Sequence, residues 1–174
     1  MKMQFTYNIF LIGFMGSGKS TVADYLCEKF DMDVVEMDQV IAERERMSIS
    51  DIFEKHGELY FRDLETKLLV ELQEKTNTVV SCGGGVAMRE CNVTEMKKNG
   101  KVVLLTAKPE TILERVENNH DRPLLENNKT VAYIAALMEK RREKYEAAAD
   151  MIIETDGKSA QKICEEMIQR LGEQ

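Results

Sequence analysis

The sequence predicts a three-layer α/β/α fold, in which helices cover both faces of a parallel β-sheet. Short apolar runs alternate with longer amphipathic segments along the chain, as in repeated strand–helix–strand units. A glycine-rich loop joins the first apolar run to the first helical segment. The chain has 174 residues, 43% of them hydrophobic, so residues 1–174 can form the core of a single domain.

The first half of the chain supplies strand and helix candidates in alternation. Residues 8–12 (NIFLI) form a continuous apolar run, which is typical of a strand buried on both faces. Leucines near helical spacing across residues 58–74 predict a long amphipathic helix. The other predicted elements are helices at 20–30, at 39–46 and from about residue 50, and strands at 32–36 and 78–81.

The second half continues this alternation. Residues 101–106 (KVVLLT) predict another strand, and Pro109 suits the first turn of the helix that follows. The polar, asparagine-rich segment 117–129 contains Pro123, and we expect it to be a mobile loop within the domain. The remaining predicted elements are a helix at 130–149, a strand at 151–154 and a helix at 159–171. Sheets of this kind bind ligands beyond the carboxyl ends of their strands, so functional residues should follow the strands.

Charge and apolar content exclude several classes of protein. The formal net charge of -7 disfavours nucleic-acid binding, which needs clustered basic surface. No apolar stretch approaches the roughly 20 residues of a membrane span. No export signal precedes the first strand, so we expect a cytoplasmic protein without a membrane partner. We also expect it to be a monomer. The four cysteines show no CxxC spacing, which argues against a zinc site.

A phosphate-binding motif lies between the first predicted strand and the first predicted helix. Residues 13–20 (GFMGSGKS) match GxxxxGK[ST] at every fixed position, and the alternative is a chance match in a glycine-rich turn. Glycines let the backbone turn its N–H groups toward a phosphate, and the following helix presents the positive end of its dipole. We expect Lys19 to reach the β- and γ-phosphates of ATP and the Ser20 hydroxyl to bind Mg²⁺. The candidate nucleotide-binding residues here are Gly16, Ser17, Gly18, Lys19, Ser20 and Thr21.

The motif alone does not specify the reaction, because the same loop serves switches, motors and kinases. A GTPase would need a guanine-reading NKxD element late in the chain, and the nearest segment, TAKP at 106–109, does not match it. The strand at 78–81 also lacks a terminal aspartate that would direct a metal. The acidic residues follow the second predicted strand instead.

Glu36 and Asp38 are two residues apart at the end of that strand. In an extended strand end they would face the same way, toward the edge where the phosphate loop opens. One could hold a metal-bound water, and the other could orient an acceptor hydroxyl and accept its proton. The alternative is that both are solvated residues that open the next helix, with Asp38 as its N-cap.

A glycine cluster and two arginines are further candidates. Residues 83–85 (GGG) follow the third strand, where they would let a ligand lie against the backbone or form a plain flexible turn. Arg122 lies beside a proline in the polar segment, where closure could bring it onto the transferring phosphoryl group. Arg62 lies beside aromatic residues, where pairing with a carboxylate ligand would explain its charge. Taken alone, either arginine also suits a solvated surface.

Taken together, these motifs resemble the shikimate kinase family over nearly the whole chain. The combination of GExxFR at 57–62, the triple glycine and RPLL at 122–125 is specific, whereas the phosphate loop is shared by many families. The paired acids and RxxxY at 141–145 complete the resemblance. It implies a fold like that of nucleoside monophosphate kinases, with five parallel strands, a substrate-binding region at about 37–65 and a mobile lid at about 117–129.

The resemblance also implies an activity and a set of site residues. The chain would transfer the γ-phosphoryl group of ATP, with Mg²⁺, to the 3-hydroxyl of shikimate, in the pathway to chorismate and the aromatic amino acids. Arg115 would lie against adenine, and Arg122 would be the lid arginine on ATP. Together with Lys19 and Asp38, Arg122 would be catalytic. The residues that would hold shikimate are Asp38, Arg62, Gly83, Gly84, Gly85 and Arg141, with Asp38 near the accepting hydroxyl and both arginines on the carboxylate.

One departure and two alternatives remain. The family usually has Asp-x-Asp after the second strand, whereas here Glu36 supplies the first acid and the metal contact, directly or through water. Another small-molecule kinase, for gluconate or a nucleoside monophosphate, would share the phosphate loop but leave GExxFR and the triple glycine unexplained. A non-catalytic nucleotide-binding module is the other alternative, and the intact lysine, serine, acid and lid arginine argue against it.

Overall fold

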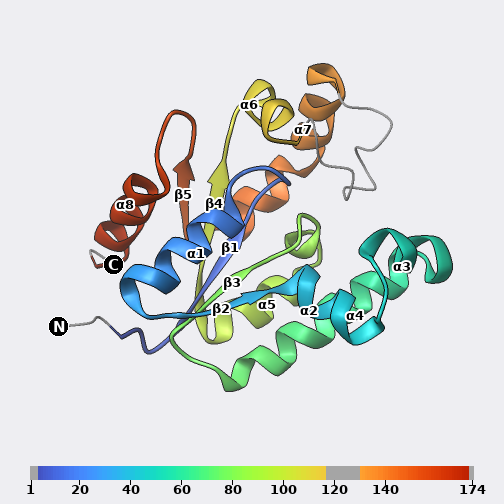
Figure 1. Cartoon of the computed structure of the whole chain (residues 1–174), viewed down its shortest axis with the longest axis horizontal. Helices are drawn as coiled ribbons and strands as arrows, with labels where there is room; N and C mark the ends of the chain where they lie inside the picture. The colour runs from blue at the N-terminus through green and yellow to red at the C-terminus, as the bar shows by residue number, and fades with distance from the viewer. Residues whose placement is uncertain (1–3, 117–129, 173–174) are drawn as a thin grey trace.

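The structure is a computed structural model that describes residues 4–116 and 130–172. Five parallel strands form one sheet in the order β2-β3-β1-β4-β5, with helices on both faces (Figure 1). The predicted three-layer fold and its five-stranded parallel sheet are therefore confirmed. The strands are β1 (Asn8–Ile12), β2 (Asp33–Glu36), β3 (Thr78–Ser81), β4 (Gly100–Thr106) and β5 (Met151–Glu154).

The central strand β1 divides the core into two layers, because alternate side chains of a strand point to opposite faces. Ile9 and Leu11 pack with α1 and α8 on one face of the sheet. Phe10 and Ile12 pack on the other face, in a cluster to which α4, α5 and α7 contribute. All five residues of β1 are buried, as the continuous apolar run predicts.

The helices lie close to their predicted positions. The long helix of the first half ends earlier than predicted, because residues 72–74 form a short 3₁₀ turn, η1 (Leu72–Glu74). The helices are α1 (Lys19–Phe30), α2 (Met37–Glu45), α3 (Ile49–His56), α4 (Glu58–Glu71), α5 (Glu90–Lys98), α6 (Pro109–Val116), α7 (Val131–Ala148) and α8 (Ala160–Gly172).

Two elements were not predicted. A 3₁₀ turn, η2 (Val86–Met88), follows the triple glycine, and α5 follows that turn. The buried residues of α5 are Asn92 and Met96, so its inner face carries one polar and one apolar side chain. A helix whose buried face is half polar gives no apolar periodicity to detect.

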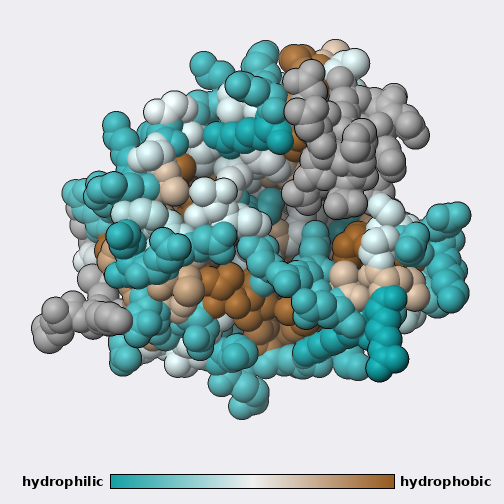
Figure 2. Space-filling model, in the orientation of Figure 1, coloured by the Kyte–Doolittle hydropathy of each residue, from teal (hydrophilic) through white to brown (hydrophobic). Residues whose placement is uncertain are grey.

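The outer surface carries a group of apolar side chains on a largely polar background. In the view of Figure 2 the surface is mostly hydrophilic, and apolar side chains gather over the edge strand β2, where Val34 and Val35 are half-buried. None of the helices described in 4–116 and 130–172 is long and apolar enough to cross a membrane. The predicted lid at 117–129, with Arg122, lies outside the described residues.

Candidate active site

A cleft of about 810 Å³ opens beyond the carboxyl ends of β1, β2 and β3. This is the position expected for a ligand site in a parallel α/β sheet. The cleft brings together residues that are far apart in the sequence. The predicted site residues that line it are Gly16, Gly18, Lys19, Ser20, Thr21, Glu36, Asp38, Gly83, Gly84 and Arg115.

The phosphate loop has a backbone that only glycine readily adopts. Gly16 and Gly18 have φ of 82° and 102°, in the region that side chains disfavour. A Cβ atom on Gly16 would also lie 2.9 Å from Val116 Cγ1. Gly18 precedes α1, so the amino end of that helix points into the cleft. Both glycines are therefore required by conformation.

Polar atoms of the loop fit a bound phosphate. The Lys19 ammonium donates to the carbonyl oxygens of Gly13 (2.7 Å) and Phe14 (3.2 Å), so it already lies over the loop. The Ser17 hydroxyl is buried and has no hydrogen-bond partner within the described part of the chain. A buried hydroxyl without a partner costs free energy, and a phosphate oxygen would satisfy it.

Glu36 and Ser20 meet at the edge of the same cleft. Burial raises the pKa of the Glu36 carboxyl, and hydrogen bonds from the hydroxyls of Ser20 and Ser81 oppose that increase. These oxygens are of the type that Mg²⁺ prefers, usually with water and phosphate as the other ligands. No group of three or more His, Cys, Asp or Glu side chains capable of holding a metal occurs among the described residues.

Asp38 reaches the cleft from a helix, whereas an extended strand end was expected. β2 ends at Glu36, which is the N-cap of α2, and Asp38 lies in the first turn of that helix. Asp38 is therefore neither a strand residue nor the N-cap, and both sequence interpretations of its backbone were wrong. Both acids still line one cleft, because the helix begins at the strand end.

Two arginines lie close to the triple glycine. The Arg62 side chain is only 15% exposed, and its guanidinium forms ion pairs with Glu65 (2.9 Å) and Glu58 (3.2 Å). Arg141 on α7 has a buried Nη1 atom without a hydrogen-bond partner among the described residues, and its guanidinium lies over the Phe14 ring at 5.9 Å. Arg141 does not itself line the cleft, but its Nη1 atom lies against Gly84, which does. A buried guanidinium nitrogen without a partner is suited to an anionic ligand.

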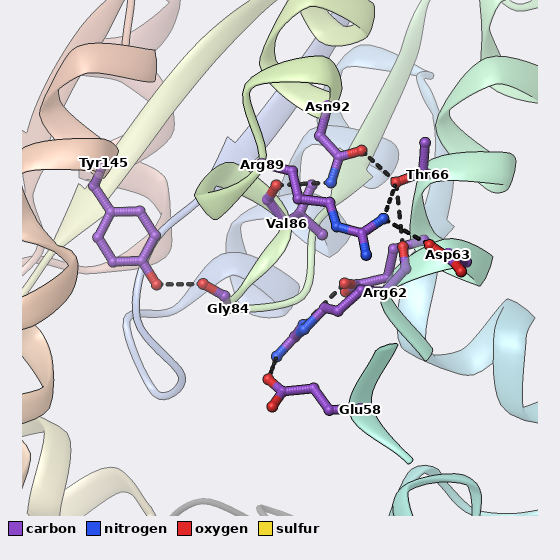
Figure 3. A network of polar contacts seen from close by, with 10 residues as sticks. Glu58, Arg62, Asp63, Thr66, Gly84, Val86, Arg89, Asn92 and Tyr145 are labelled. Carbon is purple, nitrogen blue, oxygen red and sulfur yellow. Dashed lines mark hydrogen bonds and ion pairs between the residues drawn. The ribbon is translucent and has the colours of Figure 1, made fainter. Parts of the chain in front are cut away.

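Backbone conformation does not require the triple glycine, because none of its members has a positive φ. Close packing does require it. A Cβ atom on Gly83 would lie 2.9 Å from Asp38 Oδ1, and one on Gly84 would lie 3.1 Å from Arg141 Nη1. A Cβ atom on Gly85 would overlap the Arg62 guanidinium. The Gly84 carbonyl also accepts a hydrogen bond from the Tyr145 hydroxyl (Figure 3). Charged side chains thus converge on this turn, which the flexible-turn alternative does not explain.

Glu65 is a further residue at the triple glycine, and sequence reasoning missed it. Its side chain is fully buried, and a Cβ atom on Gly83 would lie 2.7 Å from its Oε2 atom. In the helical pattern of α4 a glutamate is ordinarily a surface residue. The only available signal was its position three residues after Arg62, where an ion pair within one helix is possible.

Burial raises the pKa of Glu65 to about 7, although the neighbouring Arg62 guanidinium opposes this. The folded protein therefore retains a proton that the unfolded chain loses near pH 4.5. Relative to Glu65→Gln, the free energy of unfolding of the wild type should fall by about 1 to 3 kcal/mol as pH rises from 4.5 through 7. Denaturant titrations of both proteins at pH 5 and pH 8 measure this difference. A difference that does not change with pH would contradict the prediction.

Arg115 lies on the other side of the phosphate loop. It extends from α6 and donates to the Gly16 carbonyl (2.9 Å) and to the Thr155 hydroxyl (3.2 Å), just after β5. The structure therefore separates the predicted nucleotide arginine from the two arginines at the triple glycine. Arg122 lies outside the described residues, so its predicted position is not tested.

Comparison with known proteins now identifies the family. A family model described as shikimate kinase matches residues 15–172. The chain belongs to the shikimate kinase family. A shikimate kinase from Sulfurihydrogenibium sp. is 44% identical over 94% of this chain and 97% of its own length. The structure of a shikimate kinase from Acinetobacter baumannii in complex with shikimate covers 95% of this chain and 92% of that one, with 33% identity and a TM-score of 0.90.

The fold itself is shared more widely than the shikimate kinase family. A gluconokinase from Sinorhizobium meliloti covers 98% of this chain with a TM-score of 0.61 but only 17% identity. A likeness at that identity concerns the fold alone. It does not support the gluconate alternative, whereas family membership makes this chain an ATP-dependent kinase.

Proposed function

We propose that this chain transfers the γ-phosphoryl group of ATP to the 3-hydroxyl of shikimate, giving shikimate 3-phosphate and ADP. The observation that carries the proposal is the acceptor site, where Arg62, Arg141 and Asp38 converge on the triple glycine beside the phosphate loop. A small acid that carries hydroxyl groups matches these charges: the arginines suit its carboxylate, and the aspartate suits a hydroxyl.

The acceptor site and the phosphate loop are in direct contact. A Cβ atom on Gly84 would lie 3.8 Å from the Met15 amide nitrogen, so the triple glycine packs against the loop. Phe14 belongs to that loop and supports the Arg141 guanidinium. An acceptor held here would therefore lie next to the transferred phosphoryl group, which supplies the proximity that phosphoryl transfer requires.

Each side chain has a specific role in this mechanism. Asp38 orients the accepting hydroxyl and takes its proton, and the Lys19 ammonium stabilises the negative charge of the transferred group. Ser20, and Glu36 directly or through water, would hold Mg²⁺, which when bound neutralises charge on the β- and γ-phosphates. Arg115 would contact the adenine, on the far side of the loop from the acceptor.

Arg122 keeps its proposed role on the strength of the RPLL motif. As the lid arginine it would contact the transferring group and help exclude water. We further propose that the lid comprises residues 117–129 and the acceptor region residues 37–65, within one domain, and that the protein acts as a monomer in the cytoplasm.

The test is ADP release from ATP and Mg²⁺ with shikimate as acceptor, run beside gluconate, AMP and no acceptor. Lys19→Ala serves as the control for contaminating enzymes. Turnover that requires shikimate and Mg²⁺ is the expected result. Turnover with gluconate or AMP but not with shikimate would overturn the assignment of shikimate as the acceptor. ATP binding without turnover on any acceptor would favour a non-catalytic binding module.

A further inference from the structure

A bridge of polar side chains connects α4 with α5 behind the acceptor site (Figure 3). The Thr66 hydroxyl on α4 donates to Asn92 Oδ1 on α5 at 2.7 Å. The Asn92 amide nitrogen donates in turn to the Val86 carbonyl at 2.9 Å. We call Thr66 and Asn92 the α4–α5 bridge.

One end of the bridge lies beside Arg62 on α4, and the other end lies beside the triple glycine. Thr66 follows Glu65 directly and lies one helical turn after Arg62, so it shares a rigid element with both. Val86 follows Gly85 directly and begins η2, and its own N–H donates to the Gly83 carbonyl at 3.1 Å. The bridge thereby connects the helix that carries the Arg62 guanidinium to the turn against which that guanidinium packs.

The buried polar atoms of the bridge have hydrogen-bond partners. Asn92 is 1% exposed, and its amide group both donates and accepts. Arg89 adds an outer layer, donating to Asp63 (2.9 Å) and to the Thr66 hydroxyl (3.2 Å). An apolar residue at position 92 would fill the space, but it would not fix the helix and the turn at one separation.

We infer that Thr66 and Asn92 are positioning residues for the acceptor carboxylate site. They hold the distance between the Arg62 guanidinium and the backbone of residues 83–85, and none of their side-chain hydrogen bonds within the described part of the chain reaches the phosphate loop. The inference rests on the proposed function, because it assigns these residues to shikimate binding. Loss of the bridge should therefore weaken acceptor binding while ATP binding is retained.

The experiment compares three single variants with the wild type. Thr66→Val keeps the β-branched shape and removes the hydroxyl, whereas Thr66→Ser keeps the hydroxyl. Thr94→Val is the matched control, because among the described residues the exposed Thr94 hydroxyl on α5 donates only to the Glu90 carbonyl of its own helix. For each protein, kcat, the KM for shikimate, the KM for ATP and the thermal unfolding midpoint are measured.

The expected result is a rise of about three- to tenfold in the shikimate KM of Thr66→Val, with the ATP KM unchanged. Thr66→Ser should restore the wild-type value and Thr94→Val should not alter it. If Thr66→Val lowers only the unfolding midpoint, or raises both KM values equally, the bridge is merely structural and the inference is overturned. A wild type that does not turn over shikimate overturns the proposed function and this inference with it.

Discussion

Replacement of Asp38 by asparagine should lower kcat about 10³-fold while leaving ATP binding nearly unchanged. The substitution keeps the size of the side chain and its place in the first turn of α2, but it removes the negative charge that accepts the hydroxyl proton. General base catalysis typically contributes about 10²- to 10⁴-fold to a rate. Steady-state kinetics with shikimate, together with calorimetric titration of ATP, measure the two effects separately.

Asp24→Asn provides the matched control for this substitution. Asp24 lines the same cleft from α1 and loses the same charge, but its charge acts on Glu36, whereas Asp38 lies against Gly83. Its kcat should stay within about threefold of the wild-type value. Near-normal turnover of Asp38→Asn would show that an ionised carboxylate at this position is not essential, and Asp38 would then only orient the hydroxyl.

The second large effect is expected from Gly85→Ala. Its Cβ atom would overlap the Arg62 guanidinium, lying 2.7 Å from Nη2, so the guanidinium must move away from the acceptor site. Because Gly85 has φ of -98° and only the end of a long side chain must shift, the fold should tolerate the change. We expect the KM for shikimate to rise about 10- to 100-fold, the range for loss of a charge-assisted hydrogen bond.

A graded series of glycine substitutions tests that explanation. Gly84→Ala would place its Cβ atom 3.1 Å from Arg141 Nη1, a milder contact, and should raise the shikimate KM less than Gly85→Ala does. A Cβ atom on Gly172 would meet nothing within 4 Å, so Gly172→Ala should leave both KM values unchanged. If Gly85→Ala binds shikimate normally, close packing does not explain this glycine.

The fold could be predicted from the sequence wherever the pattern of apolar residues was uninterrupted. The strands β1, β3 and β5 have the predicted limits, because each is a short apolar run between clear turn signals. α5 was missed because Asn92 occupies its buried face, and polar burial depends on partners such as Thr66 that are distant in the sequence. Periodicity cannot reveal a partner in another element.

Only part of the candidate site could be predicted from the sequence. The phosphate loop could be found from its sequence motif, since its glycines are required by local backbone conformation. The reason why residues 83–85 must be glycine could not be predicted, because the atoms that exclude a Cβ there belong to α2, α4 and α7. Glu65 was missed because its burial is a tertiary property. The lid and Arg122 lie outside the described residues and stay predictions.

The strand order has a consequence for how such enzymes diverge. β1, which the phosphate loop follows, is central; the proposed acceptor residues Asp38 and Arg62 lie on the β2 and β3 side, whereas Arg141, Arg115 and Thr155 come after β4 or β5. Mutations in α2 or α4 can alter the acceptor side without touching the contacts that hold Arg115, because those contacts lie on the opposite side of β1. Acceptor preference can therefore change during evolution while the Arg115 side of the nucleotide site is kept.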